Sequence, residues 1–158
     1  MRENPEENQV RIPVILLALG LVYLIGSLLT YSTYPLSQSP QLDAAENITL
    51  ASQMASGELP NEPFYRAPLY PYILSILAPA DWRPLMGMLL GFICHLVSGA
   101  LVFGLARTIW QKKSAACLAT ALYLLNPASI FYSFQILDIT FATTLFLGGV
   151  YLLHVGKQ

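Results

Sequence analysis

Residues 41–72, QLDAAENITLASQMASGELPNEPFYRAPLYPY, form a polar stretch between long apolar segments. They carry the carboxylates of Asp43 and Glu46, a glycine at position 57 and then a proline-spaced connector. The run before them, residues 12–30, contains no charged residue, and about 20 apolar residues are enough to cross a bilayer. The stretch is therefore expected to be a loop between membrane spans, and it is the first place to look for a functional site.

The composition of the whole chain is that of an integral membrane protein. Of its 158 residues, 55% are apolar and 11% are charged, with a mean hydropathy of +0.55, whereas about a quarter of the residues of a soluble domain are charged. We predict an all-helical protein with about four transmembrane helices and an extracytoplasmic loop that carries one or two interfacial amphipathic helices. The expected spans are residues 12–31, 85–107, 114–132 and 136–155.

The parts between these spans follow from the same apolar pattern. Within the loop of residues 32–84, apolar residues recur at helical spacing from Leu42 and Gly57 ends the pattern, which predicts an amphipathic helix over residues 41–56. Residues 72–78 are apolar but too short to cross, so they form either a second interfacial helix or a re-entrant piece. The remaining parts are the tail 1–11, the loop 108–113, the turn 133–135 and the tail 156–158.

The basic residues predict the orientation of the chain in the membrane. If the N-terminus is cytoplasmic, only Arg66 and Arg83 lie outside, as the positive-inside rule requires. The other six basic residues are then cytoplasmic: Arg2, Arg11, Arg107, Lys112, Lys113 and Lys157.

Asp43 and Glu46 are the first candidates for catalysis. They are separated by about one helical turn, so their side chains can project from one face, and a carboxylate within reach of an acceptor can act as a general base. The alternative is that Asp43-Ala-Ala-Glu46 is a capping box that starts the helix. Asn47-Ile48-Thr49 has the form of a glycosylation triplet, but such triplets are common by chance and this one lies inside the expected helix.

Arg66 is the candidate for binding a phosphate group. A guanidinium matches phosphate oxygens, and the aromatic rings of Tyr65 and Tyr70 around it suit sugar rings or the headgroup zone. The alternative is that Arg66 is an interfacial residue within an aromatic belt.

Two further ionisable residues stand at or inside the later spans. Asp138, at the outer entrance of the fourth span, could face Asp43 across a site or cap the helix that follows it. His95 lies inside the second span, where an ionisable group is a functional hypothesis by default. It shares a small-residue face, where another helix would pack, so a packing histidine is the alternative. That face also contains Gly87, Gly91 and Gly99.

Three segments of the chain resemble the N-terminal portion of a known family. LDAAENITLASQMASGE (residues 42–58), PFYRAPLYPYIL (63–74) and NPASIFYSFQILD (126–138) resemble GT-C fold glycosyltransferases. The most similar group is the dolichyl-phosphate-mannose protein mannosyltransferase-like group, glycosyltransferase family 39, which also resembles the aminoarabinose transferase of lipid A modification. The resemblance implies a multi-pass protein of the bacterial inner membrane with a cytoplasmic N-terminus.

The resemblance also implies an activity and roles for residues. The chain would be part of an inverting transferase that moves a sugar from a polyprenyl phosphate to a lipid, glycan or protein acceptor. Asp43 would deprotonate or orient the acceptor, with Glu46 as its helical neighbour. Arg66 would contact the donor phosphate, and Tyr65, Tyr70 and Asp138 would line the substrate site. Membrane lipids are expected partners and nucleic acid is not; no cofactor is expected, and metal dependence is left open.

The chain departs from the family pattern in three ways. Ala44 replaces the second acidic residue that usually follows the first, and whether Glu46 compensates for it is open. Gln135 stands where relatives often carry an acid, so a second carboxylate role would fall to Asp138 or be absent. Family members also have more spans, so we expect this chain to correspond to their N-terminal portion. Whether such a portion is active by itself is left open.

Two other functions are compatible with the sequence. A non-catalytic membrane subunit or assembly module would pack against a partner through the small-residue face of residues 85–107. A transporter or flippase subunit for lipid-linked sugars would need polar residues along a path through the spans, and the sequence offers little besides His95 and a few hydroxyl groups.

Overall fold

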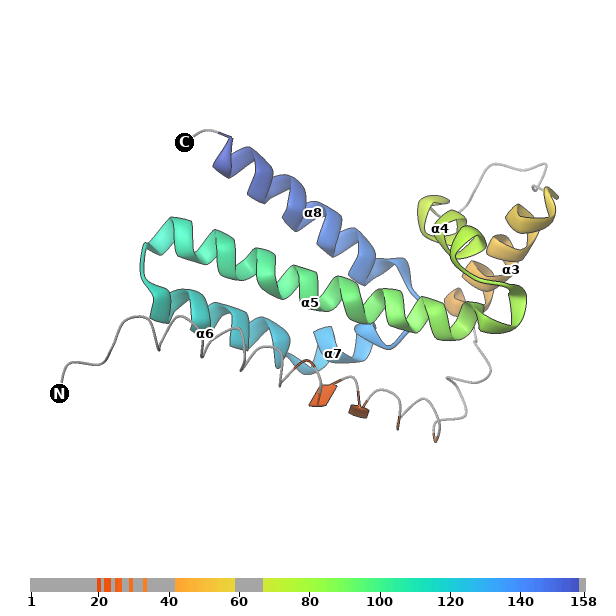
Figure 1. The fold of residues 1–158 in the computed structure, drawn as a ribbon, viewed down its shortest axis with the longest axis horizontal. Helices are drawn as coiled ribbons and strands as arrows, with labels where there is room; N and C mark the ends of the chain where they lie inside the picture. The colour runs from red at the N-terminus through yellow and green to blue at the C-terminus, as the bar shows by residue number, and fades with distance from the viewer. Residues whose placement is uncertain are drawn as a thin grey trace. The chain divides into compact units, whose positions relative to one another are not determined.

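The computed structural model describes residues 42–58 and 67–156, with isolated positions between residues 20 and 33 (Figure 1). The chain divides into two units, Met1–Gln38 and Ser39–Gln158, and the account below concerns the second. Most of the predicted span at residues 12–31 lies outside the described residues. So do Tyr65 and Arg66.

All regular structure in the described ranges is helical, as predicted. No strand occurs among these residues. The elements are α3 (Asp43–Ser56), α4 (Leu69–Leu77), the short 3-10 helix η1 (Ala80–Trp82), α5 (Arg83–Trp110), α6 (Lys113–Leu124), α7 (Pro127–Ser133) and α8 (Asp138–Val155).

Two of these helices are long and apolar enough to cross a membrane: α5 together with η1 (Ala80–Trp110), and α8. Helices α6 and α7 would make a third span if they are taken together, although they are bent by 57°. The described residues therefore contain two candidate membrane-spanning helices, and the arrangement of four spans stays a prediction.

The bend between α6 and α7 has a clear local cause. Pro127 has no amide hydrogen and its ring excludes a continuous helix. The side chain of Asn126 starts the new helix, because its Oδ1 accepts hydrogen bonds from the backbone amides of Ala128 (2.9 Å) and Ser129 (3.2 Å).

Helix α5 is the central element of the unit, with α6 and α8 packed along it and α3 and α4 near its N-terminal end (Figure 1). Its glycines allow close approach of other segments. A Cβ atom at Gly91 would lie 2.7 Å from the backbone oxygen of Ser133, and one at Gly99 would lie 2.7 Å from Cδ2 of Leu124. The small-residue face is therefore covered by the chain's own α6 and α7.

Hydroxyl groups join α5 to α8 in the middle of the bundle. Ser98 Oγ lies 2.9 Å from Thr144 Oγ1, and the same Thr144 hydroxyl lies 2.9 Å from the carbonyl oxygen of Cys94. Such interhelical hydrogen bonds are a common way to fix helix pairs in membranes.

His95 has the surroundings of a packing residue. It is buried between α5 and α6, its ring stacks on that of Tyr123 with centroids 5.1 Å apart, and its Nε2 lies 3.4 Å from the carbonyl oxygen of Leu124. These contacts support the packing interpretation.

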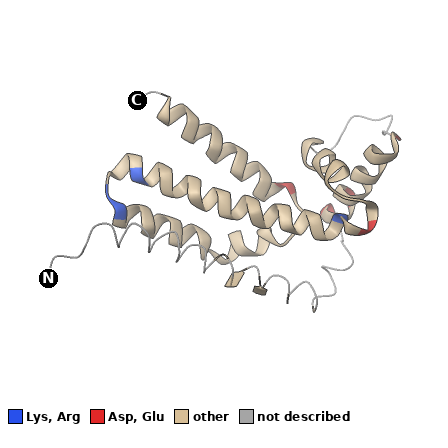
Figure 2. Cartoon of the chain, in the orientation of Figure 1, with Lys and Arg blue, Asp and Glu red and all other residues tan. Residues whose placement is uncertain are grey.

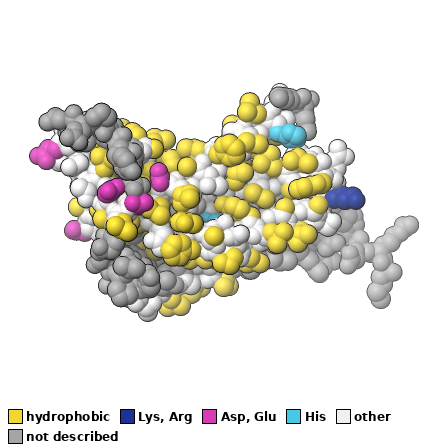
Figure 3. All heavy atoms as spheres, turned by 180° about the vertical axis from the view of Figure 1, so that it is seen from behind, with side chains coloured by type: hydrophobic (Ala, Val, Ile, Leu, Met, Phe, Trp, Pro, Cys, Tyr) yellow, Lys and Arg dark blue, Asp and Glu magenta, His cyan; other side chains and the backbone are white. Residues whose placement is uncertain are grey.

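Charge divides the unit into two ends (Figure 2). The acidic end contains α3, α4, η1 and the start of α8, and the basic end contains the junction of α5 and α6. Figure 3 shows hydrophobic side chains over the middle of the visible face, with the acidic side chains gathered at one end. Among the described residues, the acidic end holds five acidic residues and one basic residue: Asp43, Glu46, Glu58, Asp81, Asp138 and Arg83. The basic end holds Arg107, Lys112 and Lys113.

Candidate functional site

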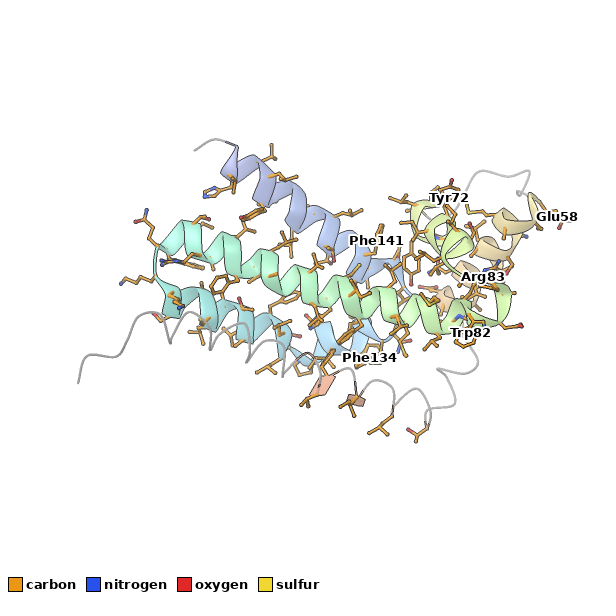
Figure 4. The ribbon with its side chains drawn as sticks, viewed as in Figure 1. Glu58, Tyr72, Trp82, Arg83, Phe134 and Phe141 are labelled. Carbon is orange, nitrogen blue, oxygen red and sulfur yellow. The ribbon has the colours of Figure 1, made fainter. Side chains whose placement is uncertain are left out.

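The acidic end is built on a small apolar core shared by α3, α4 and the segment before α8. Tyr70, in α4, is 1% exposed and packs in this core with the side chain of Ile136. Phe141 of α8 closes one side, with its ring centroid 6.0 Å from that of Tyr70 (Figure 4). A Cβ atom at Gly87 would lie 2.7 Å from Cγ2 of Ile136, so the start of α5 approaches the same core closely.

Asn47 connects α3 to the segment that leads into α8. Its side chain is 1% exposed, and its Nδ2 donates a hydrogen bond of 3.0 Å to the carbonyl oxygen of Ile136, 89 positions later in the sequence. A buried polar group is costly unless it is hydrogen-bonded. This bond therefore specifies one register between the two segments.

The position of Asp43 follows from that bond. A helix turns by about 100° per residue, so Asp43 projects about 40° from the direction of Asn47, and Glu46 about 100°. Both carboxylates belong to exposed residues. Asp43 therefore stands at the edge of the packed face of α3, whereas Glu46 lies further round the helix.

The capping-box alternative for Asp43 is wrong. Leu42 occupies the N-cap position and no side chain caps the helix, so Asp43 is its first residue. Leu42 has a φ of 48°, in the left-handed region that a leucine rarely adopts. A strained backbone position therefore directly precedes the candidate carboxylate.

Asp138 is the first residue of α8 and is half-buried. It does not cap α8, because Leu137 holds the N-cap position and no side-chain cap is formed. Burial is the main cause that raises the pKa of Tyr70 above its ordinary value of 10.0, and electrostatic interactions with Cys94 and then Asp138 raise it further. Asp138 also follows two residues after Ile136, which packs in the same core as Tyr70.

The expectation that Tyr70 contacts substrate does not fit this structure. Its ring belongs to the core, and its hydroxyl donates a 3.4 Å hydrogen bond to the carbonyl oxygen of Gly87. Tyr70 supports the site from below the surface, since it joins α4 to the start of α5.

Arg83 is a residue that sequence reasoning missed. It is the first residue of α5 and is only 6% exposed, and its Nη1 donates a 2.7 Å hydrogen bond to Ser52 Oγ of α3 (Figure 4). In the sequence, Arg83 is followed by a proline and stands at the start of an apolar run. This position is typical of an interfacial residue and does not indicate that the side chain is buried.

The described residues hold no group of three or more His, Cys, Asp or Glu side chains that could bind a metal ion. The chain matches no protein-family model, no curated protein and no solved structure at a significant level. The assignment of a function therefore depends on the residues of the acidic end.

Proposed function

We propose that this chain is part of a membrane glycosyltransferase that moves a sugar from a polyprenyl-phosphate donor to an extracytoplasmic acceptor, with inversion at the sugar carbon. Asp43 is the catalytic carboxylate in this proposal. The protein would lie in the bacterial inner membrane with the acidic end outside the cell.

One observation carries the proposal. The buried hydrogen bond from Asn47 to Ile136 joins the first polar segment to the start of α8. It supports a single acidic surface on which Asp43 is exposed one helical turn from Asn47, and Asp138 begins the helix two residues after Ile136. These are segments in which the resemblance to the GT-C family was found.

The chemistry requires one base on the acceptor side. The Asp43 carboxylate would accept the proton of an acceptor hydroxyl or amine as that atom attacks the anomeric carbon. The bond from this carbon to the phosphate oxygen breaks with its electron pair, and polyprenyl phosphate leaves. Attack from the face opposite the leaving group inverts the configuration.

The alternative of a partner-binding subunit is less well supported. The face proposed for the partner contains Gly91 and Gly99, and these residues already lie against Ser133 and Leu124 of the same chain. An assembly module would therefore need another surface.

The proposal is tested by transfer from radiolabelled polyprenyl-phosphate-linked mannose and aminoarabinose in permeabilised membranes that contain the chain. Asp43→Asn should lower the transfer rate by about 10²-fold to 10⁴-fold, the usual contribution of a general base. Glu58→Gln is the matched control, because Glu58 is also an exposed carboxylate next to α3, and it should leave the rate unchanged. Equal rates for the wild type and Asp43→Asn would remove Asp43 from the mechanism.

A further inference from the structure

Arg83 is a buried cation for which the described part of the chain provides no anion. Its guanidinium donates one hydrogen bond, from Nη1 to Ser52 Oγ, and its Nε is buried without a hydrogen-bond partner. No carboxylate within residues 42–58 and 67–156 forms an ion pair with it. An arginine keeps its charge, and a buried charge that lacks a counter-ion is strongly unfavourable.

The position of Arg83 adds to this cost. It lies in the first turn of α5, a helix of 28 residues, where the helix dipole is positive and favours a negative charge. Arginine therefore stands where an acidic residue would be preferred. An anion at this position would be favoured by the guanidinium and by the helix end together.

The surroundings place this cation at the level of lipid headgroups. Trp82 precedes it and is 60% exposed, and tryptophan is enriched at the membrane interface. Arg83 is the fourth residue of the apolar segment Ala80–Trp110, and so lies close to its N-terminal end. A phosphodiester is the anion most abundant at that depth, and the arginine fork matches two phosphate oxygens.

We propose that Arg83 and Ser52 form a binding site for the phosphate of an anionic bilayer lipid. The assignment of a phosphate to Arg83 does not rest on the proposed glycosyltransferase activity, whereas the choice between a bilayer lipid and the sugar donor as its source does. The lipid phosphate would accept hydrogen bonds from the guanidinium N–H groups that do not bond to Ser52, and it would supply a negative charge that the described residues do not provide.

The site is separate from the carboxylate of Asp43. Ser52 lies nine residues after Asp43 on α3, which corresponds to about 180° around the helix and about 14 Å along it. A phosphate held at Arg83 is therefore on the opposite side of α3 from the candidate catalytic residue. This geometry favours a bilayer lipid over the sugar donor as the source of the phosphate.

The first test counts lipids that stay bound to the chain after extraction, by native mass spectrometry. The wild type should retain phosphatidylglycerol in preference to phosphatidylcholine. Arg83→Gln should lower that retention on the order of tenfold, because it removes a charge-assisted pair. Arg107→Gln, at the basic end, is the matched control and should keep the wild-type retention. Equal retention in Arg83→Gln and the wild type would overturn the proposal.

Added competitors identify the source of the phosphate. Phosphatidylglycerol should stay bound when inorganic phosphate or polyprenyl phosphate is added, and Asp43→Asn should not change its retention. If polyprenyl phosphate replaced the lipid at Arg83, the site would belong to the sugar donor. Displacement by inorganic phosphate would identify a free anion. Either result would overturn the assignment to a bilayer lipid.

A second measurement covers the case in which Arg83→Gln does not fold. The unfolding temperature of the wild type should be higher in phosphatidylglycerol nanodiscs than in phosphatidylcholine nanodiscs, since a ligand stabilises the state that binds it. Arg83→Lys keeps the charge but loses the two-pronged guanidinium, so its increase in unfolding temperature in phosphatidylglycerol should be smaller than that of the wild type. The increase for Arg107→Gln should equal that of the wild type. An equal gain in Arg83→Lys and in the wild type, or no gain in the wild type, would contradict the site.

Discussion

The acidic end and the middle of the bundle are held together in different ways. At the acidic end, an amide and a guanidinium make the connections: Asn47 donates to the backbone before α8, and Arg83 donates to α3. In the middle, helices approach through glycines, and short hydroxyl side chains such as Ser98 and Thr144 connect them.

This difference matches the lengths of the elements. Helix α3 has 14 residues and α4 has nine, and isolated helices this short are marginal in water. They need specific contacts to hold one position. The long helix α5 is stabilised mainly by packing along its sides, and a few hydroxyl pairs are enough to fix its position against α8. The comparison predicts that loss of the Asn47 connection at the acidic end costs more stability than loss of the hydroxyl pair in the middle.

The largest effect is expected where the two regions meet, at Gly91. Gly91→Ala would place a Cβ atom 2.7 Å from the backbone oxygen of Ser133, and backbone cannot move aside as a side chain can. We expect a loss of about 3 kcal/mol in the free energy of unfolding, measured by titration with a denaturing detergent. The matched control is Gly149→Ala, because nothing lies within 4 Å of that position; it should be neutral or stabilising. An equally neutral Gly91→Ala would show that α7 does not pack closely on α5.

The next largest effect is expected at Asn47. Asn47→Ala leaves the carbonyl oxygen of Ile136 buried without this partner, which should cost about 2 kcal/mol. Thr49→Ala on the exposed face of α3 is the control and should change stability by less than about 0.5 kcal/mol. If both substitutions had the same small effect, the acidic end would not depend on its long polar connection.

A smaller effect is expected for the hydroxyl pair in the middle of the bundle. In a double-mutant cycle with Ser98→Ala and Thr144→Val, the coupling energy should be about 0.6 kcal/mol, the average for such pairs in membrane proteins. A coupling as large as the loss at Asn47 would abolish the distinction between the two regions.

The smallest effect at neutral pH is expected at Tyr70. Tyr70→Phe removes a long hydrogen bond, so the loss should be about 0.5 kcal/mol. The pKa of Tyr70 is raised above 10.0 in the folded protein, so the folded state holds the proton more tightly than the unfolded state. Its stabilisation is therefore complete below pH 10.0 and declines as the pH rises above that value. Unfolding temperatures across this range should fall less steeply in Tyr70→Phe than in the wild type; equal slopes would contradict the assignment.

Much of the fold could be predicted because it depends on local patterns. Gly57 adopts a φ of 76° at the end of α3, which the glycine after an amphipathic run indicates. Asn126-Pro127 marks the break between α6 and α7. The four-residue spacing from Gly91 to Gly99 indicates a close-packed face on α5. Each of these signals acts within a few residues of its position.

The connections at the candidate site could not be predicted, since they join residues far apart in the chain. Asn47 stands in a triplet of the glycosylation type, which gives no indication of a structural role. Its hydrogen-bond acceptor is the backbone carbonyl of Ile136, and a backbone group cannot be recognised as a partner from the sequence. In the sequence, Arg83 is informative only about the orientation of the chain in the membrane. Its burial depends on the position of α3. Tyr70 was expected at the surface of the site because aromatic rings suit sugars, yet the same ring fills the core below it.

The bend at Asn126-Pro127 has a consequence for the surrounding bilayer. Helix α6 has 12 residues, or about 18 Å at 1.5 Å per residue, against a hydrocarbon thickness of about 30 Å. If α6 is part of a third membrane span, α7 must cross the rest of the hydrocarbon layer, but α7 is bent by 57° relative to α6. Lipid tails beside this pair should be compressed, and hydrophobic mismatch of this kind draws the polar surface of the membrane inward at that point.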